Sequence, residues 1–192
     1  MRERAGVYPG TFNPLTVAHL AIAQAALRQR RLSRVVFALS RSPINKEHVD
    51  RPRFADRLAI IVAEAATKPW MAVETTDARL LVDIADDYDV LIMGADKWAQ
   101  VIDPQYYGGD DTRRDAALAA LPELAIAPRP PFPVPDQHAL VVDTAFSDIS
   151  SSAVRAGARS WMSPAAASFD ELTGAWSDPA RYDRWLVSGQ ET

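Results

Sequence analysis

The chain has 192 residues and a formal net charge of -4, with 48% hydrophobic and 24% charged residues. This length suits one α/β domain with a full core, and the charge leaves no surplus of positive potential for binding duplex nucleic acid. No cysteine is present, so disulfides, thiolate metal sites and thiol catalysis are excluded.

The sequence also offers no segment suited to a membrane. A membrane-spanning helix needs a run of about 18 or more apolar residues, and Glu64 and Lys68 break the best candidate. The first residues run directly into a predicted strand, without the apolar stretch of a secretory signal. We therefore expect a cytoplasmic protein that binds neither a membrane nor nucleic acid. The sequence leaves the formation of a homo-oligomer open.

Strands and helices are predicted to alternate along the chain. Short apolar runs rich in β-branched residues predict strands, and apolar residues spaced three and four apart predict helices. The first predicted helix follows a turn over residues 9–14, which contains two prolines and a glycine. The expected strands cover residues 5–8, 34–39, 70–75, 90–93, 124–127 and 140–142, and the expected helices cover 17–30, 53–67, a segment after Asp96 and one through Leu118.

The predicted strands are almost continuously apolar, which is typical of a parallel sheet covered on both faces. We therefore predict an α/β fold, a single-domain, Rossmann-like, doubly wound parallel sheet with helices on both faces and a small helical C-terminal tail. The main domain is expected over residues 1–160, with a helical extension over 161–192 packed on it. Prolines between residues 128 and 135 predict a stiff, extended connection, and a polyproline ligand for a partner is the alternative.

The loop after the first predicted strand has features of a phosphate site. In a doubly wound sheet, ligands bind beside the carboxyl ends of the strands. Gly10 allows a phosphate to approach the backbone, and the start of the following helix favours anions. Thr16 and His19 share one face of the first helical turn, so their hydroxyl and imidazole point to the same place. The alternative is an ordinary strand-turn-helix in which His19 bonds a buried carbonyl.

A second polar cluster lies near the other end of the chain. Ser150, Ser151 and Ser152 precede a predicted helix, and Arg155 follows one turn later. Hydroxyls, backbone N–H groups and a forked guanidinium in this arrangement can hold the β- and γ-phosphates of ATP. A run of serines is also an ordinary helix N-cap, so the cluster alone leaves both interpretations open.

Both clusters resemble signatures of one superfamily. Residues 10–19 read GTFNPLTVAH, which resembles the first signature, G-[ST]-F-[DN]-P-[LIV]-[HT]-x-G-H, of the nucleotidyltransferases that include nicotinate-nucleotide and phosphopantetheine adenylyltransferases. Residues 149–155 read ISSSAVR and resemble the second signature, I-S-S-[ST]-x-[IV]-R, in the expected order along the chain. Two positions depart from the nicotinate-type pattern. Ala18 stands where a glycine is usual, and Thr16 is typical of phosphopantetheine-type members.

The resemblance also assigns roles to single residues. For some of these residues a simpler interpretation stays open. Lys46 could be a solvated surface lysine, Asp96 could only cap a helix, and the aromatic residues after Asp96 could only pack in the core. Arg57 resembles an arginine on the family's corresponding helix, with an exposed structural role as the alternative. The resemblance implies catalytic roles for His19, Thr16, Lys46 and Arg155, nucleotide binding by Gly10, Thr11, Phe12, Gly94, Asp96, Ile149, Ser151 and Ser152, and acceptor binding by Trp98, Tyr106 and Tyr107.

The activity implied by the resemblance is transfer of AMP from Mg-ATP to a small phosphorylated acceptor, with release of pyrophosphate. The chain length, the helices after the sheet and the element at residues 127–130 favour nicotinate mononucleotide as the acceptor, and hence a role in NAD biosynthesis. Phosphopantetheine is the alternative acceptor, and a degenerate member that binds nucleotide without turnover is the alternative class. We expect Mg²⁺ to be carried with ATP and no metal site on the protein, because the sequence has no dedicated carboxylate cage.

Overall fold

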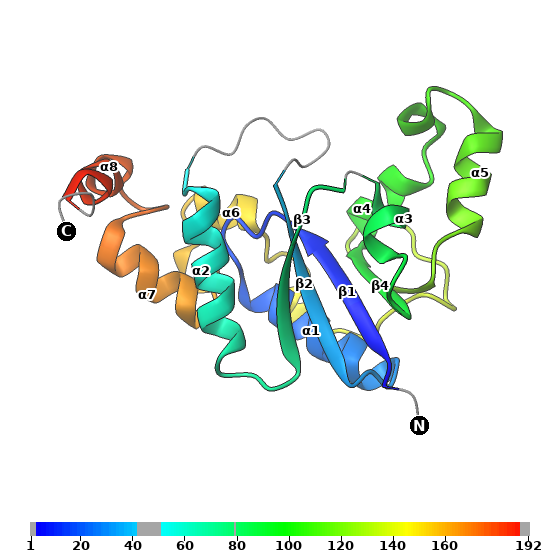
Figure 1. The fold of residues 1–192 in the computed structure, drawn as a ribbon, viewed down its shortest axis with the longest axis horizontal. Coiled ribbons are helices and arrows are strands. Elements are labelled where there is room, and N and C mark those ends of the chain that lie inside the picture. Colours follow the sequence, from blue (N-terminus) through cyan, green and yellow to red (C-terminus); the bar gives the residue numbers. More distant parts are fainter. Residues whose placement is uncertain (1–2, 42–50, 79, 189–192) are drawn as a thin grey trace.

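The computed structural model describes residues 3–41, 51–78 and 80–188, and a five-stranded sheet forms its centre. All neighbouring strands are parallel, in the order β3-β2-β1-β4-β5, so the direction of strand order reverses between β1 and β4 (Figure 1). The predicted Rossmann-like fold is confirmed. The strands are β1 (Ala5–Gly10), β2 (Arg34–Ser40), β3 (Met71–Thr76), β4 (Val90–Gly94) and β5 (Glu123–Ala127).

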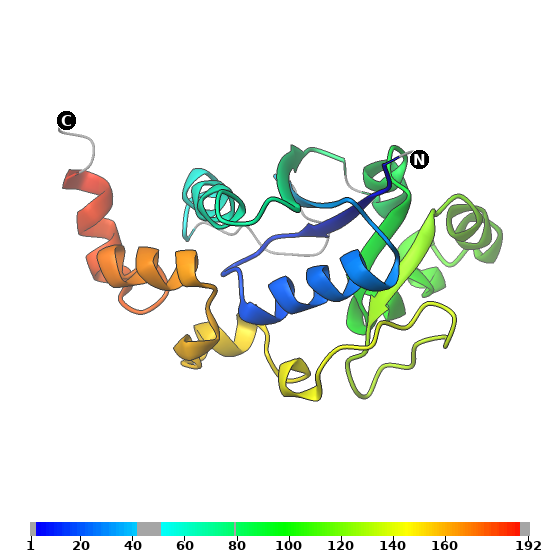
Figure 2. The same cartoon turned by 90° about the horizontal axis from the view of Figure 1, so that it is seen from below.

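Helices cover both faces of the sheet, and the pleat of the strands explains how. Successive strand side chains point to opposite faces, so Phe37 of β2 belongs to one core cluster and its neighbour Ala38 to another. The first cluster contains residues of α1 and α2, and the second contains residues of α3 and α4. Figure 2 shows α1 along one side of β1. These helices are α1 (Val17–Gln29), α2 (Phe54–Ala65), α3 (Leu81–Ala85), α4 (Ala95–Val101) and, before β5, α5 (Asp111–Ala119).

The predicted sixth strand at residues 140–142 is wrong. After β5 the chain returns beside the sheet only as an isolated parallel bridge between Ala139 and Ile126. The side chain of Gln29 then bonds both backbone groups of Val141, donating to its carbonyl at 2.7 Å and accepting from its N–H at 2.9 Å. Val141 is 83% exposed. The ladder with β5 stops here because its next bond would need an N–H donated by residue 128 to the carbonyl of Leu140, and Pro128 has no N–H.

The C-terminal helices lie beside α2 at one end of the molecule (Figure 1). A third core cluster combines Ile60 of α2, Val154 of α6, and Met162 and Ala166 from the segment that leads into α7 and its first turn. Residues on both sides of position 160 therefore share one core, and the boundary expected there stays a prediction. The elements are α6 (Ser151–Arg155), α7 (Pro164–Thr173) and α8 (Pro179–Ser188), with 3-10 helices η1 (Pro104–Tyr107), η2 (Thr144–Phe146) and η3 (Arg159–Trp161).

Within the described residues, none of the helices combines the length and the apolar character needed to span a membrane.

Candidate functional site

A cavity of about 710 Å³ opens at the carboxyl ends of β1 and β4, where the strand order reverses. Doubly wound sheets bind their ligands at this position, and the volume lies in the ordinary range for small-molecule sites. Thr16, Trp98, Ile149 and Arg155 are described but lie outside the lining. The expected site residues that do line the cavity are Gly10, Thr11, Phe12, His19, Gly94, Asp96, Tyr106, Tyr107, Ser151 and Ser152.

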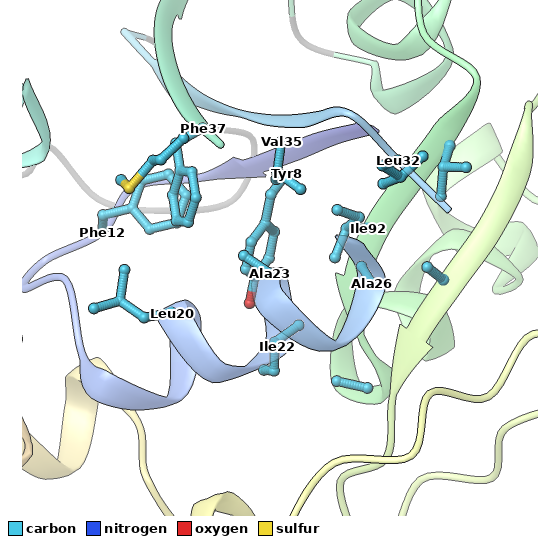
Figure 3. Packing of buried hydrophobic residues seen from close by; sticks show 14 of the residues in the cluster. Tyr8, Phe12, Leu20, Ile22, Ala23, Ala26, Leu32, Val35, Phe37 and Ile92 are labelled. Carbon is cyan, nitrogen blue, oxygen red and sulfur yellow. The ribbon is translucent and has the colours of Figure 1, made fainter. Parts of the chain in front are cut away.

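Phe12 shapes the loop that follows β1. Its φ of 43° lies in the left-handed region, which residues other than glycine seldom adopt. The buried ring lies with its centroid 5.3 Å from that of Phe37 and 5.8 Å from that of Tyr8 (Figure 3). A Cβ atom on Gly10 would come within 2.9 Å of this ring, so the loop requires glycine there. Phe12 thus fixes the loop to the core while it lines the cavity.

His19 is held by a capping box at the start of α1. Thr16 is the N-cap, and its backbone N–H donates to His19 Nδ1 at 3.0 Å. The Thr16 hydroxyl lies 2.7 Å from the same nitrogen and accepts from the backbone N–H of His19 at 3.4 Å. Because a backbone N–H can only donate, we assign Nδ1 as the acceptor and place the proton of the neutral ring on Nε2. Thr16 is fully buried, so it contributes to the site through the imidazole that it orients.

The second signature is bonded directly to the first. Ser150 caps α6, and the Ser151 hydroxyl donates to the carbonyl of Pro14 at 2.8 Å. Arg155 donates to the carbonyl of Asn13 through Nη1 and to the Ser152 hydroxyl through Nη2 at 3.2 Å. Residues separated by more than 130 positions along the chain therefore form one polar wall, which Ser150 to Ser152 present to the cavity.

The end of β4 is joined to the end of β5 and to the second signature. A Cβ atom on Gly94 would come within 2.5 Å of Asp96 Oδ1, so glycine leaves room for this carboxylate to fold back. Asp96 Oδ1 lies 3.9 Å from Arg129 Nε, and Arg129 Nη2 donates to the carbonyl of Ile149 at 3.2 Å. Ile149 is buried, so its contribution is this carbonyl contact and core packing.

Residues 7–157 of the chain match the family model described as Cytidylyltransferase-like. This match covers well over half of the sequence and includes both signatures. The chain belongs to the cytidylyltransferase-like family.

Curated relatives of the chain carry the name probable nicotinate-nucleotide adenylyltransferase. The relative from Syntrophotalea carbinolica is 38% identical over 76 residues, which are 40% of this chain and 35% of the relative. That from Citrifermentans bemidjiense is 32% identical over 111 residues, or 51% of each chain. That from Bacteroides thetaiotaomicron is 27% identical over 172 residues, which are 79% of this chain and 80% of the relative. The chain thus spans from about a third to half the length of the first two relatives.

Only some of the aromatic residues that were expected to contact the acceptor lie at the cavity. Tyr106 and Tyr107 line it, and the Tyr107 hydroxyl donates to the carbonyl of Val101 at 2.9 Å. Trp98 instead packs against the second core cluster, with its ring centroid 6.3 Å from that of His138. The position of Trp98 therefore fits core packing, because its ring lies against the core cluster that α4 covers.

Lys97 also lines the cavity, although it was not among the site residues expected from the sequence. The side chain is half-buried and donates to Gln100 Oε1 at 3.1 Å. Burial lowers the pKa of its ammonium group, and the neighbouring carboxylate of Asp96 opposes that shift. The only signal in the sequence was its place directly after Asp96, in the first turn of a helix at the end of a central strand.

Arg57 is buried, at 5% exposure, so the alternative of an exposed structural role is wrong. It donates through Nη1 to the carbonyl of Thr11 at 2.7 Å, which ties α2 to the loop after β1. Burial lowers the pKa of this guanidinium. Lys46, the remaining catalytic expectation, lies outside the described residues.

Proposed function

We propose that this family member is an adenylyltransferase that moves AMP from Mg-ATP to nicotinate mononucleotide and releases pyrophosphate. The observation that carries the proposal is the meeting of the two signatures at one cavity. His19 approaches from the start of α1, and Ser151 and Ser152 approach from the start of α6. The names of the relatives support the choice of reaction, because each is described as a probable nicotinate-nucleotide adenylyltransferase.

The proposed reaction is an in-line displacement. An oxygen of the acceptor phosphate attacks the α-phosphorus of ATP, and the bond from that phosphorus to the oxygen bridging it to the β-phosphorus breaks. Pyrophosphate leaves with the electron pair of that bond. The protein contributes positioning and stabilisation of charge, and no covalent intermediate is required.

Each polar group of the site has a task in this reaction. His19 donates its Nε2 hydrogen to a non-bridging oxygen of the α-phosphate, and Thr16 keeps the ring in that tautomer. The hydroxyls of Ser151 and Ser152 hold the phosphates that leave, and Arg155, outside the cavity lining, bonds the Ser152 hydroxyl and adds positive charge beside these phosphates. Lys46 is assigned to the charge that develops between the acceptor and the α-phosphate.

Mg²⁺ is proposed to arrive with ATP. Within the part of the chain that the structure describes, no group of three or more His, Cys, Asp or Glu could hold a metal ion. The carboxylates of Asp96 and Asp143 on the cavity wall are hard oxygen donors, which suit the water shell of a hydrated Mg²⁺. Bound with ATP, the ion would neutralise phosphate charge.

Phosphopantetheine is the second candidate acceptor, and two observations favour it. Thr16 is the residue typical of that branch. Part of the cavity wall is also apolar and suits an extended arm without a ring, with Leu80, Leu81, Ile84, Val101 and Leu121 among the lining residues.

Release of pyrophosphate from ATP with each acceptor in turn tests the proposal. Fastest release is expected with nicotinate mononucleotide, and release with none of the acceptors would favour a nucleotide-binding protein without turnover.

Replacing Tyr106 and Tyr107 together by alanine is expected to raise KM for nicotinate mononucleotide about tenfold, with little change in KM for ATP. Both rings line the cavity, and an aromatic pair contributes about 0.5 to 1.5 kcal/mol beyond the area that it buries. Steady-state kinetics with each substrate varied in turn measures the effect. The double replacement by phenylalanine is the control, because it keeps both rings. Equal increases in both KM values would place the rings away from the acceptor.

Replacing Lys97 by methionine is expected to lower the preference for nicotinate mononucleotide over nicotinamide mononucleotide about tenfold. The half-buried ammonium can bond the carboxylate of the acid, and a hydrogen bond to a charged group contributes about 1.5 to 3 kcal/mol. The amide offers no charge, so its kcat/KM should change little. Lys97→Arg keeps the charge and should keep most of the preference. A loss of the same size for acid and amide would remove Lys97 from this role.

A further inference from the structure

Asn13 lies at the centre of the contacts that hold the loop after β1, and it is 7% exposed. The indole Nε1 of Trp176 donates to Asn13 Oδ1 at 2.6 Å. Arg155 donates to the backbone carbonyl of the same residue, and Asn13 Nδ2 donates weakly to the carbonyl of Arg51 at 3.4 Å. The side-chain oxygen of a residue within the first signature is therefore satisfied by a tryptophan more than 160 positions away along the chain.

Trp176 is itself fixed by the turn that follows α7. Asp170 Oδ1 accepts from the backbone N–H of Trp176 at 2.7 Å and from that of Ser177 at 3.0 Å. Arg181 closes the turn by donating to the carbonyl of Asp170 at 2.7 Å. Gly174 has a φ of 76°, and a Cβ atom there would lie 2.8 Å from the carbonyl of Asp178. The indole is therefore presented to the loop by a turn with little freedom to move.

The same C-terminal segment contacts the loop at two further places. The backbone N–H of Ser163 donates to the carbonyl of Leu15 at 3.0 Å, and Thr16 forms an antiparallel bridge with Met162. These contacts involve the two residues directly before α1, the helix that carries His19. The C-terminal residues that make these contacts lie after residue 157, where the match to the family model ends.

We propose that residues 162–176 form a clamp on the loop after β1, with Trp176 as its positioning residue. The clamp acts on the proposed adenylyl transfer, on which this inference rests, by fixing Asn13 and, through Leu15 and Thr16, the start of α1 that carries His19. The loop needs such a restraint because Phe12 holds a left-handed φ of 43° within it. Small displacements of groups at a reacting phosphate lower the rate far more than they weaken binding.

Trp176→Phe tests this role, because it keeps a ring in place and removes the N–H donor. We expect kcat to fall about tenfold, while the Kd for ATP stays within about a factor of two. Trp185→Phe is the matched control. Trp185 lies on α8, after the clamp, and packs through its ring, 5.5 Å from Phe169 and 5.8 Å from Tyr182, so its replacement should leave kcat unchanged. An unchanged kcat in Trp176→Phe, or an equal fall in both variants, would overturn the clamp.

A double-mutant cycle with Asn13→Ala links the effect to this contact. If Trp176 acts through Asn13, the double variant should be no slower than Asn13→Ala alone, whereas independent effects would multiply and contradict the proposal. The ¹⁵N resonances of the His19 ring give a readout that needs no turnover. They should shift in Trp176→Phe and stay in place in Trp185→Phe. If the wild-type protein transferred no AMP, the proposed function would fail, and an unshifted His19 ring in Trp176→Phe would separately overturn the clamp.

Discussion

His19→Ala is expected to lower kcat by about 10² or more while ATP still binds. The Nε2 hydrogen of His19 is the donor that the site offers at the proposed position of the transferring phosphate, and removal of one such donor typically lowers kcat by about 10² to 10³. Thr16 makes this donor available by bonding Nδ1 with its backbone N–H at 3.0 Å. Ground-state binding of ATP uses other groups as well, so Kd should change much less than kcat. Rapid-quench measurement of product formation separates the two quantities.

His138→Ala is the control for this variant. The His138 side chain contacts the ring of Trp98 in the second core layer and lies outside the cavity lining. Its loss should leave kcat nearly unchanged. Near-normal turnover by a folded His19→Ala protein would remove the imidazole from the chemistry and return it to the role of a helix-capping side chain.

Glu64→Ala is expected to lower the free energy of unfolding by about 3 kcal/mol. Glu64 is 2% exposed and bonds Lys68, which lies just after the end of α2. Its other carboxylate oxygen accepts from the backbone N–H of Ala165 at 3.0 Å, at the start of α7. Alanine leaves a half-buried ammonium and a buried N–H without this partner, and it loosens α7 from α2. Urea denaturation measures the change, and Glu171→Ala, on the exposed side of α7, should alter it by less than about 0.5 kcal/mol.

The contribution of Glu64 depends on pH. Burial by itself raises the pKa of a carboxyl group, but the bonds from Lys68 and from Ala165 outweigh it and bring the pKa of Glu64 below its ordinary value of 4.5. The native state therefore binds fewer protons than the unfolded state. The stabilisation is present above about pH 4.5 and is lost as the pH falls through the native pKa. Glu64→Gln should be less stable than the wild type near pH 6, with a difference that shrinks as the pH falls below 4.5 and through the native pKa of Glu64. A difference that stayed constant would contradict this assignment.

The sheet and its first loop could be predicted from the sequence because their causes are local. A strand buried on both faces requires a continuous apolar run, as in β2 and β4, and a loop that must approach a phosphate requires the small residue found at Gly10. The predicted strand at residues 140–142 failed for a reason that lies elsewhere in the chain. Its apolar pattern is real, but Pro128, which follows β5, has no N–H for the next bond of the ladder.

The supporting groups of the site could not be predicted, because each depends on a contact that is distant in sequence. The sequence left Arg57 between a family arginine on this helix and an exposed structural residue, and only the fold brings it to the carbonyl of Thr11. Trp176 follows a glycine turn in the C-terminal tail, and no local pattern connects it with Asn13. Trp98 shows the reverse case. An aromatic residue after a G-x-D turn suggested acceptor binding, but the helical period directs the ring into the core.

In the proposed reaction, the acceptor's phosphate oxygen displaces pyrophosphate from ATP at this cavity. The most direct test incubates the purified protein with Mg-ATP and nicotinate mononucleotide that carries ¹⁸O in its phosphate. Unlabelled nicotinamide mononucleotide and phosphopantetheine are present in the same mixture, and every product is identified by mass spectrometry. We expect the nicotinate dinucleotide as the main product, with all of the label retained in it and none in pyrophosphate. Label in pyrophosphate or AMP would contradict the direct displacement, and dephospho-coenzyme A as the sole product would contradict the choice of acceptor.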